Sequence, residues 1–403
     1  MYYCFLRKAV MEYLIEKSDR KIQFIKGKPK RYLFDKIDWE QRLVLILGYR
    51  GVGKTTLLLQ YLSESNKKGV YLSLDDFYFE TNRLIKTIDM LYQKGFRLFL
   101  LDEVHRYFYW SKDLKQLYDD YPDIQLVATG SSILDLSKGN ADLSRRASVY
   151  HLHGLSFREF LLFEKKLNIK PLLLDEIIQK HQVLGADILD LIHYPTDFDN
   201  YLKYGYFPFF AEAKSTYYQK LEETINLVIE TDVAPFEELQ HSTVRTMKKL
   251  LYVISDSAPF TPNINKLSEK LETPRNTILR LLDYLDQAQI LNLLRSDTKG
   301  ISYLQKPEKI FLNNTNFIYS FSPVQPNTGS IRETFFFNQL SPVHSVTSSK
   351  YGDFMIDESF VFEIGGPSKD MEQIRGIPNA YLALDIQGGS GKRIALWLFG
   401  FLY

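Results

Sequence analysis

The sequence has a single cysteine, Cys4, among its 403 residues. A lone cysteine excludes an internal disulfide and any metal site built from several cysteines. The N-terminal stretch is not a signal peptide, because Arg7, Lys8, Glu12 and Glu16 interrupt every apolar run. No uncharged stretch approaches the length needed to span a membrane. We therefore expect a cytoplasmic protein without a membrane segment.

An excess of charge of one sign is also missing. The 50 Lys and Arg residues balance 49 Asp and Glu residues, which gives a net charge of +1. No global field therefore recruits nucleic acid or an acidic surface. The seven histidines are scattered, apart from His151 and His153, which alternate along a strand-like segment and are expected to share one sheet face. No third ligand accompanies this pair, so we predict no metal site there.

What the sequence does contain is a glycine-rich motif at residues 48–55, which match the phosphate-loop pattern G-x-x-x-x-G-K-[ST]. An apolar strand, 43–47, precedes the motif, and a leucine-rich helix start, 55–62, follows it. In this setting we expect Lys54 to reach the β- and γ-phosphates of a nucleotide, Thr55 to bind Mg²⁺, and Arg50 to pack over the site. The predicted nucleotide-binding residues are Gly48, Arg50, Gly51, Val52, Gly53, Lys54, Thr55 and Thr56.

A second motif ends the apolar strand 97–101, where two carboxylates follow in tandem. Asp102 is predicted to hold the Mg²⁺ shell, and Glu103 to act as the base that activates the attacking water. A strand that simply ends in a solvated acidic turn is the alternative. The phosphate loop upstream favours the catalytic interpretation.

Strands and helices alternate from residue 43 to about 153, with further strands at 70–74, 126–132 and 149–152 and a helix at 81–93. This alternation predicts an α/β fold with a parallel sheet and helices on both faces. Thr129 lies near the tip of one strand and is a candidate for binding the lytic water or the γ-phosphate, unless it only caps a turn.

Arg145 and Arg146 lie between the last two of these strands. One interpretation is that they neutralise transition-state charge across a subunit interface of a homo-oligomer. The alternative is a solvated basic pair.

Length and a hydrophobic content of 45% predict two or three domains. The first is an ATPase domain at 1–153, followed by a helical segment at 154–240. Residues 241–325 suggest a winged helix-turn-helix, with helices over 244–254, 264–271 and 278–285 and a hairpin of 290–294 with 309–312. Thr273 is expected to cap the third helix, with Pro274 at its first position.

The outer face of that third helix is mixed in charge, which leaves its partner open. Its candidate contact residues are Arg275, Asn276, Thr277 and Arg280, and the nearby acids are Glu269, Glu272, Asp283 and Asp286. DNA is one candidate partner. Protein docking or a purely structural role is the other.

The last predicted domain, 326–403, has a helix at 331–340 and strands at 354–356, 360–364, 380–384 and 394–399, with 396–399 as a covered strand. Glu333, Asp353 and Glu363 are candidate metal-binding acids for phosphodiester hydrolysis. Gly365 stands where such a site has a lysine, and Lys369 could substitute from a nearby helix. We expect no efficient DNA cleavage, and an active nuclease is the alternative.

Together these motifs resemble prokaryotic P-loop ATPases of the AAA-like, archaeal-ATPase group that carry a C-terminal restriction-endonuclease-like domain. The resemblance is carried by 48–56, 100–103, 129–132, 155–160, 206–208 and the acids Asp353 and Glu363. Tyr49 departs from the proline frequent in that group, and Gly365 departs from the nuclease lysine. The resemblance implies ATP as the nucleotide, the strand order of ASCE-type ATPases, and a winged helix before the C-terminal domain.

These observations predict a Mg²⁺-dependent ATPase whose cycle switches the attached winged-helix and nuclease-like domains. Two alternatives stay open: an active ATP-regulated nuclease, and a nucleotide-gated scaffold with little turnover. The sequence leaves DNA and protein as candidate partners of the attached domains.

Overall fold

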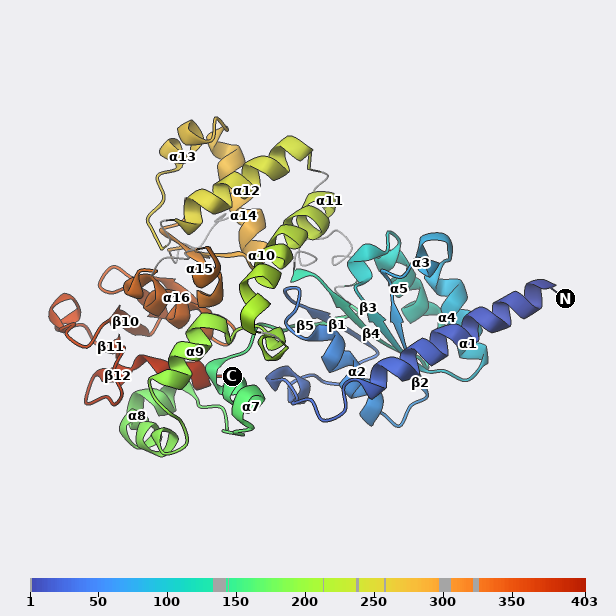
Figure 1. The fold of residues 1–403 in the computed structure, drawn as a ribbon, viewed down its shortest axis with the longest axis horizontal. Coiled ribbons are helices and arrows are strands. Elements are labelled where there is room, and N and C mark those ends of the chain that lie inside the picture. The colour runs from blue at the N-terminus through green and yellow to red at the C-terminus, as the bar shows by residue number, and fades with distance from the viewer. Residues whose placement is uncertain are drawn as a thin grey trace. The chain divides into compact units, whose positions relative to one another are not determined.

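The computed structural model describes residues 2–132, 143, 145–212, 214–236, 239–256, 259–296, 306–321 and 326–403 (Figure 1). The chain divides into two compact units. Unit 1 is Met1–His153 and unit 2 is Gly154–Tyr403. Each unit has its own principal sheet, so each is described by itself.

The sheet of unit 1 has five parallel strands in the order β2-β3-β4-β1-β5. All residues of β1, β3 and β4 are buried, as expected for apolar strands covered on both faces. The strand bounds are β1 Leu43–Leu47, β2 Gly69–Ser73, β3 Leu98–Asp102, β4 Gln125–Gly130 and β5 Ser148–His151.

Helices flank this sheet, which confirms the predicted α/β architecture of unit 1 (Figure 1). Helices α1 and α2 pack on each other and on β2, whereas α4 and α5 pack together. Right-handed crossovers place α2 on one face and α4 with α5 on the other, because the chain reverses its direction across the sheet after β2. The bounds are α1 Tyr2–Gln23, η1 Tyr32–Asp35, α2 Lys54–Glu64, α3 Tyr78–Thr81, α4 Leu84–Gln93, η2 Val104–Arg106 and α5 Trp110–Asp120.

Because all five strands are parallel, the segments that follow them meet at one edge of the sheet. Strand β4 is inserted between β1, which leads into the phosphate loop, and β3, which ends at Asp102. This is the order that the ASCE-type resemblance implies. It places Thr129, near the end of β4, between the phosphate loop and the paired carboxylates.

Two details of unit 1 differ from the prediction. The helix expected from residue 81 begins at Leu84, because Asn82 is extended and its amide donates to the Tyr78 carbonyl at 2.8 Å, closing the short α3. Strand β5 ends at His151, so His153 lies outside the sheet and the two histidines do not share a strand face. Burial, with the neighbouring His151 and Arg31, lowers the pKa of His153 to about 3.

Unit 2 begins with a helical region. Its 3-10 turns η4 and η5 precede α10, which continues directly into the π-helix η6. The bounds are α7 Phe157–Lys165, α8 Leu174–Leu189, α9 Thr196–Tyr204, η4 Pro208–Ala211, η5 Lys214–Thr216, α10 Tyr217–Leu227, η6 Val228–Val233 and α11 Ala234–Phe236.

Three further helices and a hairpin follow in unit 2. They are α12 His241–Ser255, α13 Ile264–Lys270, α14 Arg275–Gln287, β6 Leu291–Leu294 and β7 Lys309–Leu312. The two strands pair antiparallel, with Leu291 opposite Leu312. The expected capping of α14 is wrong: Pro274 itself is the N-cap, and the Thr273 hydroxyl donates back to the Leu271 carbonyl at 2.8 Å.

The C-terminal part of unit 2 is a mixed sheet in the order β12-β11-β10-β9-β8. Strands β10, β11 and β12 are parallel, and β8 and β9 run antiparallel to their neighbours. The bounds are α15 Thr315–Phe321, α16 Thr328–Leu340, β8 Val346–Ser348, β9 Phe354–Ile356, β10 Phe360–Gly365, η7 Glu372–Ile374, β11 Ala380–Leu384, β12 Arg393–Ala395 and η8 Leu396–Phe401.

The closing segment corrects one prediction. Leu396–Phe401 is buried as expected, but it forms the 3-10 helix η8 and not a strand. A short run that is apolar on all sides does not separate strand from helix. Here η8 packs against α7, α8 and α16, so helices cover it on several sides.

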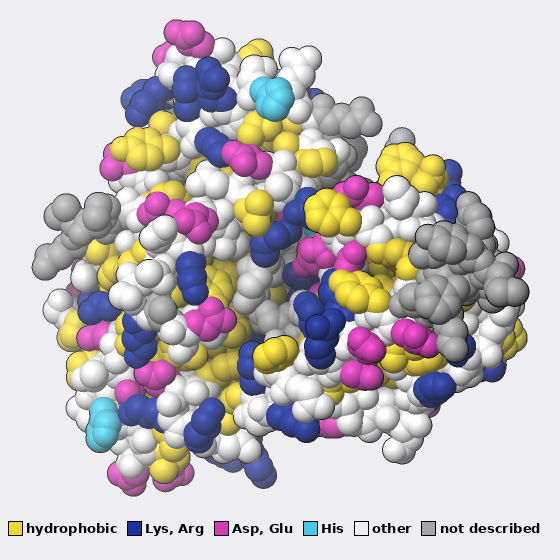
Figure 2. All heavy atoms as spheres, turned by 45° about the vertical axis from the view of Figure 1, so that its right-hand side comes forward, with side chains coloured by type: hydrophobic (Ala, Val, Ile, Leu, Met, Phe, Trp, Pro, Cys, Tyr) yellow, Lys and Arg dark blue, Asp and Glu magenta, His cyan; other side chains and the backbone are white. Residues whose placement is uncertain are grey.

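The visible surface carries basic and acidic side chains interspersed, in agreement with the balanced net charge (Figure 2). In the part of the chain that the structure describes, no helix combines the length and apolar character required to cross a bilayer.

Candidate functional site

The phosphate loop of unit 1 has the shape that its glycines allow. Gly51 and Gly53 have φ values of 86° and 103°, which residues with a Cβ rarely adopt. Helix α2 begins directly afterwards, at Lys54, so its N-terminus faces the loop. The Lys54 ammonium donates to the carbonyls of Gly48 and Tyr49 at 2.7 and 3.0 Å. The loop therefore has the form of an anion-binding site, and the Lys54 ammonium already lies inside it.

Asp102 is the centre of a buried hydroxyl network at the end of β3. Its Oδ2 accepts hydrogen bonds from the Thr55 hydroxyl at 2.7 Å and from the Tyr71 hydroxyl at 2.6 Å. Its Oδ1 accepts a hydrogen bond from Thr129. The residue is 3% exposed, and each of its oxygens has a donor. Burial, together with the nearby Asp102 carboxylate, raises the pKa of Tyr71 far above its ordinary value.

These residues fit a nucleotide and a divalent cation. Carboxylate and hydroxyl oxygens are the ligands that Mg²⁺ takes in proteins, and Asp102 and Thr55 bring such oxygens within 2.7 Å of each other. Lys54 and the loop amides supply the positive groups that phosphates need. Val52 is fully buried under the loop, and Thr56 lies in the first turn of α2.

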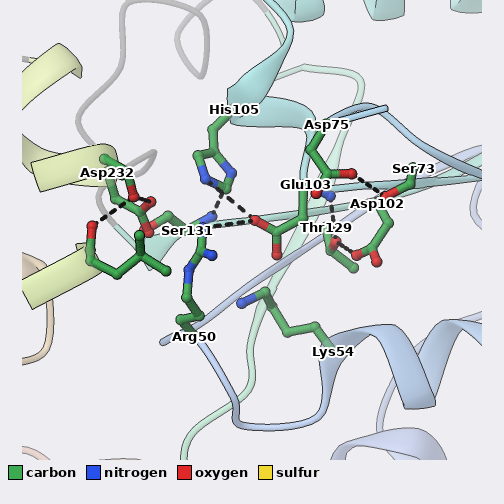
Figure 3. Close-up of polar contacts among 12 residues, drawn as sticks. Arg50, Lys54, Ser73, Asp75, Asp102, Glu103, His105, Thr129, Ser131 and Asp232 are labelled. Atoms are coloured by element: carbon green, nitrogen blue, oxygen red, sulfur yellow. Dashed lines mark hydrogen bonds and ion pairs between the residues drawn. The ribbon is translucent and has the colours of Figure 1, made fainter. Parts of the chain in front are cut away.

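Glu103 follows Asp102 and takes a left-handed backbone conformation, with φ 56° and ψ 44°. Its Oε2 lies 3.6 Å from a guanidinium nitrogen of Arg50 and 3.4 Å from Nε2 of His105. Its backbone N–H donates to the Thr129 hydroxyl at 3.1 Å. In Figure 3 the side chains of Arg50, Lys54 and Glu103 point toward one another. The base predicted from the motif thus lies beside Arg50 of the phosphate loop.

Sequence reasoning missed three residues of this site. Tyr71 and His105 contact the carboxylates directly, and Arg31 supports the loop by donating to the carbonyls of Val52 and His153. The position of His105, two residues after Glu103, was the available signal. Nothing local marks Arg31, which is buried and lies far upstream in the chain.

Arg145 and Arg146 lie away from this site in the same unit. They form a turn just before β5, at the amino edge of the sheet, whereas the loop lies at the carboxyl edge. The length of β5, roughly 13 Å, separates the two edges. Arg146 pairs with both carboxylate oxygens of Asp119, at 2.9 and 3.0 Å. The described contacts thus place neither arginine at this site within the unit, and a role across an interface stays a prediction.

In unit 2 the three candidate acids form a cluster with two lysines. Lys309, on β7, pairs with Glu333 of α16 and lies 3.7 Å from Oδ1 of Asp353. Lys369 lies 2.5 Å from Oε1 of Glu363, on β10. The Asp353 carboxylate also accepts the Ile364 N–H at 2.9 Å. Lys309 thus links two of the acids that the sequence singled out, and Lys369 pairs with the third.

Lys369 reaches Glu363 by a route that the sequence did not show. It lies in the turn after β10 and not on a helix, which corrects the expectation. A Cβ at Gly365 would lie 2.6 Å from the Lys369 Cβ, so the glycine leaves room for the lysine to cross it. An ammonium group therefore lies beside Glu363, contributed by position 369 and not by position 365.

Burial raises the pKa of Glu333 and of Glu363, and Asp353 adds repulsion to each. Within the described part of the chain, Glu363 Oε2 is buried and has no hydrogen-bond partner. Among the residues that the structure describes, however, no three His, Cys, Asp or Glu side chains form a set placed to hold a metal ion. The two lysines partly offset the charge of the three acids in this cluster.

On α14, Arg275, Asn276 and Arg280 are exposed, and Thr277 is half-buried. Two of the nearby acids turn to the hairpin: Asp283 pairs with Arg295 at 2.5 Å, and Asp286 accepts the Leu293 N–H at 3.0 Å. The exposed start of α14 is therefore more basic than the sequence indicated.

Comparison with known families gives a match in each unit. Residues 40–161 match a family described as an AAA domain, and residues 195–328 match a domain of unknown function (DUF8612). With the parallel sheet and the phosphate loop, the first match supports an AAA-like P-loop domain in unit 1. Neither match identifies a winged helix or a nuclease-like domain.

A curated relative is an uncharacterized protein of Methanocaldococcus jannaschii, 28% identical over 298 residues. The alignment covers 68% of this chain and spans 61% of the relative's length. A solved structure of the Aeropyrum pernix ORC1 protein in complex with DNA covers 79% of this chain and 92% of that one, at 13% identity and a TM-score of 0.30. A structure from a study of katanin self-assembly covers 32% and 47%, at 19% identity and a TM-score of 0.25.

Proposed function

We propose that unit 1 binds ATP with Mg²⁺ and hydrolyses the γ-phosphate, and that this cycle switches unit 2. The observation that carries the proposal is the convergence of the loop cation, the hydroxyl–carboxylate network and Glu103 at one edge of the sheet. Phosphoryl transfer depends on positioning and charge neutralisation, which are what these groups supply.

Each residue has a distinct task in this proposal. Lys54 and the loop amides bind the β- and γ-phosphates, and Thr55 and Asp102 hold Mg²⁺, which neutralises phosphate charge when bound. Glu103 accepts a proton from the attacking water. Thr129 is hydrogen-bonded to both Asp102 and Glu103. A change in position of the metal-binding carboxylate or of the base would therefore alter the hydrogen bonds of Thr129.

The decisive experiment compares ATP binding and phosphate release for the wild-type protein and Lys54→Ala. Lys54 carries the cation inside the loop, so its loss should weaken ATP binding at least tenfold, by analogy with the removal of a charged hydrogen bond. Lys68→Ala serves as a control, since its ammonium caps the Lys94 carbonyl at 2.8 Å on the surface. Equal ATP affinity of the wild-type protein and Lys54→Ala would refute the nucleotide site.

For the attached elements we propose that α12–α14 and the β6–β7 hairpin act as a winged helix that binds DNA. Support comes from the three helices, the antiparallel hairpin and the exposed Arg275 and Arg280. Arg275→Ala should weaken binding to duplex DNA and lower its salt dependence. Unchanged affinity would favour a protein partner. We further propose that the protein is cytoplasmic and assembles with copies of itself.

A second candidate function is metal-dependent phosphodiester hydrolysis in unit 2. The specific observation in its favour is that Lys369 supplies the positive group whose absence at Gly365 argued against it. Against it stands Lys309, whose ammonium already pairs with Glu333 and lies near Asp353. We expect at most weak cleavage, because Mg²⁺ competes with a resident cation.

This candidate is tested with purified protein, Mg²⁺ or Mn²⁺, and supercoiled, linear and single-stranded DNA. Cleavage that disappears in both Asp353→Ala and Lys369→Ala would establish the nuclease. Cleavage that neither change affects would come from a contaminant, and the cluster would then be structural.

A further inference from the structure

His105 lies between the proposed catalytic base and the neighbouring strand tip. The residue after β3, Glu103, has a positive φ that a non-glycine residue adopts at a cost. This conformation starts the short 3-10 turn η2, which returns His105 to the side of the Glu103 carboxylate. The imidazole is 7% exposed, so the ring is fixed by its surroundings.

The backbone determines which ring nitrogen carries the proton. The N–H of Ser131, just after β4, donates to Nδ1 of His105 at 3.3 Å. A ring nitrogen that accepts a hydrogen bond has no proton of its own, so the proton of the neutral ring is on Nε2. That nitrogen lies 3.4 Å from Oε2 of Glu103, as Figure 3 shows, close enough for an ion pair but not aligned as a hydrogen bond in this structure. Such contacts are often long without substrate and shorten in the reacting complex.

We propose that His105 is a positioning residue for Glu103. Its Nε2–H orients the carboxylate toward the attacking water, and its Nδ1 ties that orientation to the tip of β4. Arg50 lies on the same carboxylate oxygen, 3.6 Å away, and is its second fixed contact. The inference rests on the proposed ATPase function. It adds that the Glu103 side chain and the end of β4 change position together, because His105 contacts both.

The alternative is that His105 has only a packing role and fills space between η2 and β4. Two substitutions separate the alternatives. His105→Gln keeps an acceptor for the Ser131 N–H and a donor for Glu103, whereas His105→Leu keeps the volume and loses both. Positioning predicts that His105→Leu lowers kcat about 10- to 100-fold with ATP affinity unchanged, and that His105→Gln restores most of the rate. Space filling predicts similar rates for the two variants.

A double-mutant cycle tests whether His105 acts through Glu103. In a Glu103→Gln background, His105→Leu should leave the residual rate within about threefold, because the carboxylate it orients is gone. A full additional 10- to 100-fold loss would overturn the proposal. Thermal melting of each variant reports whether the fold is retained.

A readout independent of turnover keeps this inference separate from the proposed function. NMR of the protein labelled with ¹⁵N-histidine shows which ring nitrogen of His105 carries the proton. The signals that are lost in His105→Gln assign this residue. The neutral Nε2–H tautomer, with signals that shift in Glu103→Gln, is the expected result. The Nδ1–H tautomer, or signals indifferent to Glu103→Gln, would refute the contact whether or not the protein hydrolyses ATP. A wild-type protein that shows the expected signals and no turnover would refute only the ATPase.

Discussion

Replacing Glu103 with glutamine separates catalysis from binding at the candidate site. The two side chains have the same size, so the substitution leaves the phosphate loop and the Asp102 network in place. What it removes is the basic oxygen, and a positioned general base is worth about 10²- to 10⁴-fold in rate. We therefore expect kcat to fall by that factor, which raises the activation free energy by about 3 to 5 kcal/mol, and ATP affinity to stay within about threefold.

The effect on stability should be far smaller. The 3.6 Å contact between Arg50 and Glu103 corresponds to roughly 4 to 5 kcal/mol of Coulomb energy at an effective dielectric constant near 20. Both side chains are partly exposed, at 28% and 20% of their surface, so desolvation and screening leave a net contribution of about 1 kcal/mol or less. The free energy of unfolding should therefore change several-fold less than the activation barrier.

The assay is steady-state phosphate release beside equilibrium binding of a fluorescent ATP analogue. Asp75→Asn is the matched control, because this exposed carboxylate follows β2 at the same edge of the sheet. Its rate should equal that of the wild-type protein. Wild-type turnover in Glu103→Gln would show that another group activates the water, and lost ATP binding would show that the substitution damages the loop.

Three further predictions follow from particular contacts. Tyr71→Phe removes a buried donor to Asp102 and should lower the free energy of unfolding by about 1.5 to 3 kcal/mol in urea denaturation; no change would show that water replaces the hydroxyl. Burial raises the pKa of Asp286 to about 7, so its stabilising contribution is complete below pH about 4 and is lost as the pH rises through 7. Asp286→Asn should therefore gain on the order of 4 kcal/mol relative to the wild-type protein between pH 4 and 8, and parallel stability curves would contradict this. Mixing a variant with both Arg145 and Arg146 changed to alanine with Lys54→Ala should restore some ATPase activity if the arginines act across an interface, and co-assembled mixtures without recovery would exclude that role.

The predictions for unit 1 agreed with the structure wherever local chemistry decided the outcome. Apolar runs such as Leu43–Leu47 are buried parallel strands, and the glycines of the phosphate loop take the positive φ that their motif requires. The predictions were wrong where one sequence pattern is compatible with two kinds of secondary structure. The segment Leu396–Phe401 is apolar on every side, which suits a strand and a 3-10 helix equally, and packing against three helices selected the helix.

The sequence by itself determined the phosphate loop, the paired carboxylates and the order of strands and helices around them, because each depends on residue types at fixed spacing along the chain. Only the tertiary structure decided which distant side chains complete the site. Tyr71 reaches Asp102 because β2 pairs with β3, and Lys369 reaches Glu363 because the turn after β10 folds back across Gly365. A hydrogen bond or ion pair depends on distance in space, and spacing in the sequence specifies that distance only within a single helix, strand or turn.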